Sequence, residues 1–370
     1  MLEDRSIVAH SEDRVEVKVD MRSNAAASRF SSIDELLGDS RGRFFGAGYR
    51  LVRHEVTGAV VDPAARTTRA SARIEYPAAW SIKQTGELKP HLSTLDAFVL
   101  GAQLCEAHVR TAFGIDGDAA DRLWLAYTGL KPSNTPTLDL AAVPARCTLL
   151  KTERAPGSLC GHLSSFAAQV GSIGLEFVID HPMGTPREGA ASWANLDELL
   201  GPPEERYYGS AYMATQVVLR EIELDSTGER VRALIDLEDP PELPRLRGMG
   251  AAYFPFVSGP DVVIGFAQLA QALMYRYDGV TRDVSHNLWM RRVALHSGAP
   301  VGTRRGLPGE TWSTKLSLLP IKDTRWRSGS FALTVPGVTG EYNLAHQLPT
   351  AQPAGPIARA RAANDKDQLP

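Results

Sequence analysis

The chain carries one sixteen-residue pattern twice, and this internal repetition limits its possible folds more than any other feature. DELLGDSRGRFFGAGY begins at Asp34 and DELLGPPEERYYGSAY begins at Asp197, an offset of 163 residues (197 − 34). The opening Asp-Glu-Leu-Leu-Gly is identical, and three more identities keep the register: Arg43 with Arg206, Gly46 with Gly209, and Tyr49 with Tyr212. Agreement over so many positions indicates either a duplicated domain or one local structure used twice.

A second pair of segments favours duplication. KPHLSTLDAFVLGAQLCEAHV in the first half aligns with FPFVSGPDVVIGFAQLAQALMY in the second. Six identities share one register: Pro90/Pro255, Ser93/Ser258, Asp96/Asp261, Ala102/Ala267, Gln103/Gln268 and Leu104/Leu269. The offset here is 165 residues (255 − 90), so a short insertion separates the two anchors, as expected of diverged copies of a domain.

The order of elements within each copy predicts the fold class. A β-hairpin is followed by a helix that is apolar almost all round, and such a helix is buried on most sides. Short strands then follow, at 124–127, 147–152 and 175–179 in the first half and at 293–296, 314–319 and 331–335 in the second. A curled antiparallel sheet around one buried helix is the hotdog architecture, so we expect an α+β double hotdog. A parallel α/β fold would need a helix after nearly every strand.

The predicted boundaries follow from this alignment. We expect a mobile N-terminal tail over 1–31, a first hotdog repeat over 32–190 and a second over 191–347. A disordered tail is expected over 348–370, because this stretch is rich in Pro, Ala and charge.

Composition and spacing exclude several kinds of partner. A net charge of −3 gives no concentrated basic surface for nucleic acid. No run of about eighteen apolar residues is present, and charge occupies the N-terminus where a signal peptide is apolar, so no membrane partner is expected. Three cysteines without C-x-x-C spacing predict reduced thiols and a cytoplasmic location. Histidine and glycine spacings match no metal or nucleotide motif, so no metal and no cofactor are predicted.

The second helix entry resembles that of the β-hydroxyacyl-ACP dehydratases. That family has a His-Phe-Pro opening, a Pro-Gly turn and an apolar helix ending in Ala-Gln. In YFPFVSGPDVVIGFAQLAQA, Tyr253-Phe254-Pro255 and Ala270-Gln271 hold this frame. The catalytic His of that family would fall on Tyr253 and its acidic partner on Ala267. The resemblance therefore implies a shared fold, and it makes standard dehydration at this site an unfavoured interpretation.

A closer resemblance covers more of the chain. RFFGAGY at 43–49, YPAAWSIK at 76–83 and KPHLSTLDAF at 89–98 resemble, in this order, three sequence boxes of the avirulence protein D (AvrD) family. The match is specific over about 33–107 and extends to about residue 347. It implies a role in making syringolide-like signals, in which a β-ketoacyl chain is joined to a ketosugar such as xylulose and cyclised. The resemblance assigns no catalytic residues.

Candidate site residues come from the two helix starts, where N–H groups and the helix dipole can hold a developing oxyanion. They are His91, Ser93, Thr94 and Asp96 in the first half, and Tyr253, Ser258 and Asp261 in the second. The Ser-x-x-Asp spacing is typical of a capping box, which is the favoured interpretation of both pairs. The alternative is that one Asp is a buried general base, and Ser93, Thr94, Ser258 and Asp261 are otherwise assigned to substrate binding.

His91 breaks the symmetry, because Phe256 stands at the equivalent position. We therefore predict His91 as a general acid/base, with Asp96 and Tyr253 as further catalytic candidates. A solvent-exposed or core histidine, and a tunnel-lining Tyr253, are the alternatives. Trp80 and Lys83 are candidates for holding a sugar or phosphate, although an aromatic-plus-Lys pair on an edge strand is more often structural. The working pocket is expected at the first helix start, with second-half residues completing its wall.

The resulting hypothesis is an enzyme that condenses or cyclises a β-ketoacyl-derived substrate with a sugar-like ketone. The small-molecule acyl substrate is expected as a thioester or sugar ester, and a homodimer is one option for assembly. Two rivals stay open: a hotdog dehydratase or acyl-thioesterase, and a non-catalytic protein that binds an acyl ligand.

Overall fold

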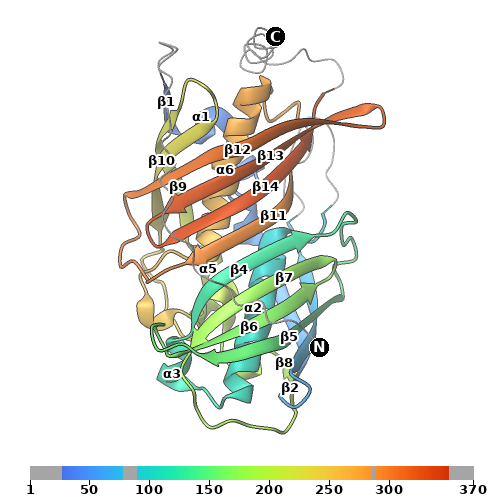
Figure 1. Cartoon of the computed structure of the whole chain (residues 1–370), viewed down its shortest axis with the longest axis vertical. Helices are drawn as coiled ribbons and strands as arrows, with labels where there is room; N and C mark the ends of the chain where they lie inside the picture. The colour runs from blue at the N-terminus through green and yellow to red at the C-terminus, as the bar shows by residue number, and fades with distance from the viewer. Residues whose placement is uncertain (1–26, 78–89, 286–287, 350–370) are drawn as a thin grey trace, which may run out of the picture.

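The computed structural model describes residues 27–77, 90–285 and 288–349, which form one 14-stranded sheet with two long helices (Figure 1). The first half consists of β1 (Ser28–Ser32), α1 (Asp34–Leu37), η1 (Ser40–Gly42), η2 (Gly48–Leu51), β2 (Arg53–Asp62), β3 (Thr67–Glu75), α2 (Thr94–Ala112), α3 (Gly117–Asp121), β4 (Trp124–Pro132), β5 (Val143–Arg154), β6 (His162–Val170) and β7 (Ile173–His181).

The second half repeats this series. It consists of β8 (Ala191–Asn195), α4 (Asp197–Leu200), η3 (Pro203–Glu205), η4 (Tyr207–Ala211), α5 (Tyr212–Ala214), β9 (Gln216–Leu224), β10 (Arg230–Glu238), η5 (Ala251–Tyr253), α6 (Gly259–Asp278), β11 (Leu288–Ser297), β12 (Leu307–Ile321), β13 (Thr324–Val335) and β14 (Val338–Gln347).

The strand order confirms the predicted double hotdog. It runs β1-β9-β10-β12-β13-β14-β11-β4-β7-β6-β5-β3-β2-β8, so the second half of the series is the first half reversed, with each strand replaced by its counterpart. The two half-sheets join where β11 pairs with β4, in the register Val293↔Leu130 to His296↔Tyr127. Each half-sheet curves over one long helix, α6 in the upper half of Figure 1 and α2 in the lower half.

The two repeats exchange their first strands, which the sequence did not predict. Strand β1 of the first half pairs with β9 of the second, and β8 of the second half pairs with β2 of the first. The predicted N-terminal tail ended at residue 31, and this boundary is wrong, because residues 28–32 form β1. These five residues belong to the sheet, although their sequence carries no strong strand pattern.

Both long helices are buried on nearly every side, as their apolar sequence predicted. Phe98 and Leu104 of α2 and Leu269 of α6 are fully buried. Gly101 lets α2 approach its sheet closely, since a Cβ there would lie 2.7 Å from Cδ1 of Leu175. Burying each large apolar side chain contributes roughly 1.5–3 kcal/mol, so these helices hold the two cores together.

The repeated sixteen residues build the same corner in both halves. Arg43 forms an ion pair with Asp34, and Arg206 forms the equivalent pair with Asp197. The repeated glycines permit close backbone contacts, because a Cβ on Gly46 would lie 2.3 Å from the Ser40 carbonyl oxygen, and one on Gly209 would lie 2.4 Å from that of Pro203. The repeated tyrosines, Tyr49 and Tyr212, stack on each other with ring centroids 6.4 Å apart. The motif is therefore structural, and it joins the two repeats.

Candidate active site

A cavity of about 160 Å³ lies at the N-terminus of α2. The first half contributes His91, Ser93 and Thr94, which precede or begin the helix. The second half contributes residues of α6 and β11, with Ala267, Gln268, Gln271, Leu288, Trp289 and Met290 among them. The cavity thus lies between the two repeats, at the helix start where the sequence placed the working pocket. The catalytic and substrate-binding roles of its residues stay predictions.

The first turn of α2 offers hydrogen-bond donors beside this cavity. The leading N–H groups of a helix have no partner within the helix, and its dipole makes this end partly positive. The Asp96 N–H is already used, since it donates to Ser93 Oγ at 3.1 Å. Thr94 Oγ1 donates to Met290 Sδ at 3.4 Å, which links the helix start to the second half. An oxygen that gains negative charge would be stabilised at this wall.

Asp96 is fully buried in that first turn and is the centre of a polar network. Its Oδ1 lies 3.0 Å from His54 Nε2. Its Oδ2 accepts hydrogen bonds from the Tyr76 hydroxyl and, at 2.5 Å, from Ser93 Oγ. The Ser93 N–H donates to the Tyr76 oxygen at 3.0 Å. The carboxylate therefore ties β2 and the end of β3 to the helix cap.

The sequence did not identify His54 or Tyr76 as candidates. Tyr76 opens the YP-x-x-WS-x-K box, which was the one available signal, whereas His54 sits in an ordinary alternating strand. Burial, together with the neighbouring Asp96 carboxylate, raises the pKa of Tyr76 well above its usual value, so its hydroxyl stays protonated and donates. His54 Nδ1 is buried and, in the described part of the chain, has no hydrogen-bond partner.

The equivalent start of α6 is fully committed to structure. Ser258 and Asp261 form a complete capping box, with Asp261 N–H donating to Ser258 Oγ at 3.2 Å and Ser258 N–H donating to Asp261 Oδ2 at 2.9 Å. Tyr207 donates to Asp261 Oδ1 at 2.7 Å, and Arg304 Nη1 lies 3.6 Å from Oδ2. Neither Ser258 nor Asp261 lines the cavity at α2, and the substrate-binding role of both stays a prediction.

His91 and Phe256 occupy different surroundings, although they hold equivalent positions. His91 is half-buried and stacks on Trp289 of β11, with ring centroids 5.4 Å apart. Phe256 is fully buried and packs edge-to-face on Trp124 at 5.4 Å. The His91 imidazole thus lines a cavity, whereas the Phe256 ring is part of a hydrophobic core.

Tyr253 lies elsewhere. Its hydroxyl donates to the Arg122 carbonyl oxygen at 3.0 Å and lies 3.5 Å from Cys160 Sγ, and its ring packs edge-to-face on Trp124. It does not line the cavity at α2, so the structure separates it from the other two catalytic candidates. Burial raises the pKa of Tyr253, which keeps the phenol protonated.

Two predicted substrate-binding residues, Trp80 and Lys83, lie outside the described residues. Among the residues that are described, no group of three or more His, Cys, Asp or Glu side chains is placed to hold a metal ion. Across those same ranges, no helix combines the length and the apolar character needed to cross a membrane.

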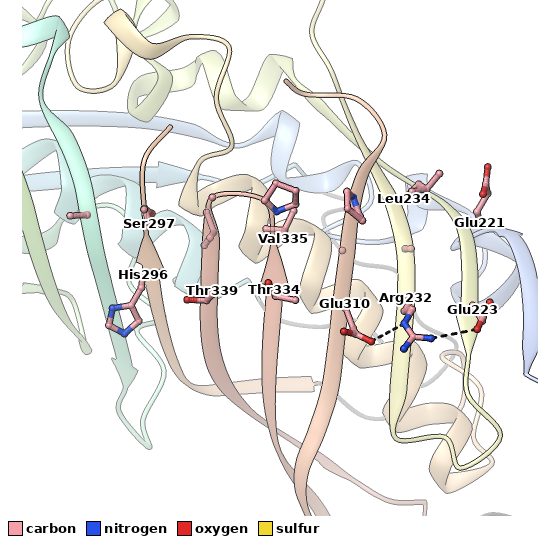
Figure 2. Close-up of a pocket in the computed structure, with 18 residues that line it drawn as sticks. Glu221, Glu223, Arg232, Leu234, His296, Ser297, Glu310, Thr334, Val335 and Thr339 are labelled. Atoms are coloured by element: carbon pink, nitrogen blue, oxygen red, sulfur yellow. Dashed lines mark hydrogen bonds and ion pairs between the residues drawn. The ribbon is translucent and has the colours of Figure 1, made fainter. Parts of the chain in front are cut away.

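A larger depression, of about 1030 Å³, lies across the strands of the second half (Figure 2). Its one arginine is engaged by acidic neighbours, since Arg232 lies 2.8 Å from Glu310 and 3.7 Å from Glu223. Arg232 alternates along β10 with the buried Val231 and Ala233, so the depression is on the face of the sheet turned away from α6. It involves neither helix start, and we therefore place the candidate site in the smaller cavity.

The strand order and the two enclosed helices make this a double hotdog protein. The family model of the Pseudomonas avirulence D protein (AvrD) matches residues 28–349. The chain therefore belongs to the AvrD family, which confirms the resemblance seen in its sequence boxes.

Solved structures similar to this chain are distant from it. A tesB protein of Mycobacterium avium subspecies paratuberculosis is 9% identical over 76% of this chain and 93% of that chain, with a TM-score of 0.37. A Mycobacterium tuberculosis protein described as a double hotdog is 11% identical over 88% and 97%, with a TM-score of 0.38. A 12:0-ACP thioesterase from Umbellularia californica is 11% identical over 76% and 94%, with a TM-score of 0.36. A comparison with curated protein sequences gives no match.

Proposed function

We propose that this protein is a biosynthetic enzyme that joins a β-ketoacyl group to a sugar-like ketone and cyclises the product. The observation that carries the proposal is the cavity at the start of α2, which has His91 on one wall and residues of the second repeat on the other. Membership of the AvrD family supports the substrate class, because syringolide-type products combine these two parts. The acyl group is proposed to arrive as a thioester.

The chemistry needs a base and a site for negative charge. The α-carbon between the two carbonyl groups of a β-ketoacyl chain is acidic, and neutral His91 would take a proton from it. The enolate oxygen would lie at the Ser93–Thr94 wall, where the α2 dipole and N–H groups stabilise it. The carbanion then attacks the ketone carbonyl and forms the carbon–carbon bond, and the resulting alkoxide takes the proton back from the His91 imidazolium. A hydroxyl of the sugar-like partner would then attack the thioester carbonyl, which closes the ring and releases the thiol with the hydroxyl proton.

Asp96 is proposed to hold the start of α2 in place. Its carboxylate is occupied by His54, Tyr76 and Ser93, so it would act by holding the helix cap rather than by touching substrate. Ala267 lines the cavity, and it stands where the dehydratase family places its acid. This difference disfavours dehydratase chemistry at the cavity.

The test compares small molecules made by a host that expresses the chain beside a β-ketoacyl source. We expect a new product with wild type and at least about a hundredfold less with His91→Phe, the usual weight of a general acid/base. His91→Phe should fold, because Phe is accepted at the equivalent position 256. Release of the free β-keto acid would indicate a thioesterase, and a co-purified acyl ligand without turnover would indicate a binding protein.

A further inference from the structure

Both repeats have an arginine and a glutamine at equivalent positions, but the hydrogen bonds of the two pairs differ. In the second half, Arg206 uses all three nitrogens: Nη1 donates to Gln103 Oε1 at 2.9 Å, Nε donates to the Gly201 carbonyl oxygen at 3.0 Å, and Nη2 bonds to Asp197 at 2.5 Å. The guanidinium is 2% exposed and fully satisfied. This corner is complete without a ligand.

The equivalent pair in the other corner is broken. Arg43 and Gln268 hold the positions of Arg206 and Gln103, and Gln268 Nε2 donates to the Ile264 carbonyl oxygen as Gln103 Nε2 does to that of Val99. Arg43 is 4% exposed, and only its Nη2 is engaged, by Asp34. Arg43 Nε, Arg43 Nη1 and Gln268 Oε1 are buried and, over the described ranges, have no hydrogen-bond partner. Both side chains line the cavity at α2.

The charge around the two corners also differs. Glu106 is buried near Arg206, where it accepts from the Met249 N–H at 3.1 Å, but the equivalent residue beside Arg43 is the neutral Gln271. A second guanidinium, Arg282, lines the cavity instead. Burial is the largest influence on the pKa of Arg43 and lowers it; Asp34 opposes this, and the positive charge of Arg282 adds to it. Two guanidinium groups, those of Arg43 and Arg282, therefore line this cavity.

We propose that this cavity binds an oxyanion, with phosphate as the class, carried by a small hydroxylated molecule. Phosphate oxygens would accept from Arg43 and Arg282, because guanidinium groups suit phosphate. A hydroxyl of the same molecule would donate to Gln268 Oε1, which has no donor among the residues that the structure describes. A volume of about 160 Å³ suits such a head group rather than a whole acyl chain. This inference adds to the proposed function that the sugar-like partner is a phosphate ester. The identification of the phosphate-bearing molecule as that partner rests on the proposed function.

The test is direct binding without turnover. We would titrate the full chain with inorganic phosphate, ribose 5-phosphate, ribose and coenzyme A at constant ionic strength, by calorimetry and thermal unfolding. We expect saturable binding of ribose 5-phosphate, weaker binding of phosphate and none of ribose. Tighter binding of coenzyme A than of the sugar phosphate would keep the oxyanion site but assign it to the thioester carrier. No binding of any phosphate compound at about 10 mM, roughly ten times the weakest affinity usual for a metabolite site, would overturn the proposal.

The decisive variant is Gln271→Glu, which gives the cavity the carboxylate that Glu106 provides in the other corner. We expect at least about a tenfold loss of phosphate affinity with an unchanged or higher melting temperature, since the new charge faces two guanidinium groups. Arg69→Gln on the exposed face of β3 is the control, because it changes the net charge by the same single unit away from the cavity. Equal phosphate affinity in Gln271→Glu and wild type would refute the site.

Failure of the phosphate site can be distinguished from failure of the proposed reaction. His91→Phe should still bind ribose 5-phosphate, because the imidazole is not part of the Arg43–Gln268 pair. Phosphate binding without product would reject the reaction alone, and product formation without phosphate binding would reject this site alone. Should Gln271→Glu fail to fold, Arg282→Gln removes the second positive charge and carries the same expectation of at least a tenfold loss.

Discussion

At the scale of single residues, equivalent positions in the two repeats have acquired different chemical surroundings. Asp96 and Asp261 both begin a buried helix, but Asp96 bonds to His54 and Tyr76, whereas Asp261 bonds to Tyr207 and lies near Arg304. A buried carboxylate needs such partners, because an unpaired charge in a core is costly. The two carboxylates therefore have different partners, and the cavity at the start of α2 lies beside the first of them.

One buried histidine gives a prediction about stability. Burial, with help from the positive charge of Arg66, lowers the pKa of His108 from 6.5 to about 4. Its Nδ1 lies 3.0 Å from Thr68 Oγ1 in the core of the first repeat. In the unfolded chain this imidazole takes up a proton near pH 6.5, but in the folded protein it does so only near pH 4. Stability is therefore full above pH 6.5 and is lost as the pH falls toward 4.

The expected loss from His108 is about 3 kcal/mol in the free energy of unfolding between pH 7 and pH 4. Urea unfolding at a series of pH values measures it, and His108→Gln is the comparison. The variant keeps a polar contact for Thr68 but cannot titrate, so its stability should fall less steeply over that range. Parallel pH curves for the two proteins would show that His108 is not the group responsible.

At the scale of elements, each long helix begins with the same Ser-x-x-Asp cap, but the two caps serve different surroundings. The cap of α6 is closed by reciprocal hydrogen bonds and buried. The cap of α2 is shared with the Asp96 network, and Ser93 lines the cavity. The same four-residue pattern is thus structural in one repeat and adjacent to the candidate site in the other.

Replacing each cap serine by alanine separates these roles. Ser258→Ala should lower the free energy of unfolding by about 1 kcal/mol and leave product formation per folded molecule unchanged. Ser93→Ala should lower stability by a similar amount and also reduce product formation. Chemical denaturation and the product assay are run on both variants; a Ser258→Ala protein of normal stability that makes no product would place Ser258 in the active site.

At the scale of the whole molecule, the two repeats depend on each other through shared strands. Strand β1 completes the second half-sheet and β8 completes the first, while β4 and β11 join the two at the centre. Separating the repeats would leave strand edges unpaired in both halves, and unpaired strand edges promote association.

Fragments 1–190 and 191–370 test this dependence. Fragment 1–190 lacks β8, which pairs with its β2, and fragment 191–370 lacks β1, which pairs with its β9. Each fragment also has only one strand of the central β4–β11 pair. We expect neither fragment alone to unfold cooperatively as a monomer. Co-expressed fragments, with a tag on only one, should co-purify as a one-to-one complex that is detectable by size-exclusion chromatography. Two independently folded monomers that do not associate would show that the exchange contributes little.

The sequence by itself determined the duplication, the double hotdog and the helix start at which the cavity lies. These features follow from patterns along the chain: two constant offsets, helices that are apolar on nearly every side, and His91 at the position equivalent to Phe256. The sequence did not show that Tyr253 lies away from this cavity, because its position in the helix-entry motif does not reveal which side chains surround it. The N-terminal boundary was wrong because β1 is recruited by the other repeat, and a short strand does not reveal its partner.

Only the tertiary structure decided which residues surround the site. His54, Tyr76 and Asp96 meet because β2, β3 and α2 converge, although up to 42 positions separate them in the chain. Arg206 donates a hydrogen bond to Gln103, whereas Arg43 Nε and Nη1 and Gln268 Oε1 have no partner in the described ranges, although both pairs have the same two residue types. The reason is that a hydrogen bond changes over a few tenths of an ångström, and the packing of the two diverged repeats sets distances at that scale.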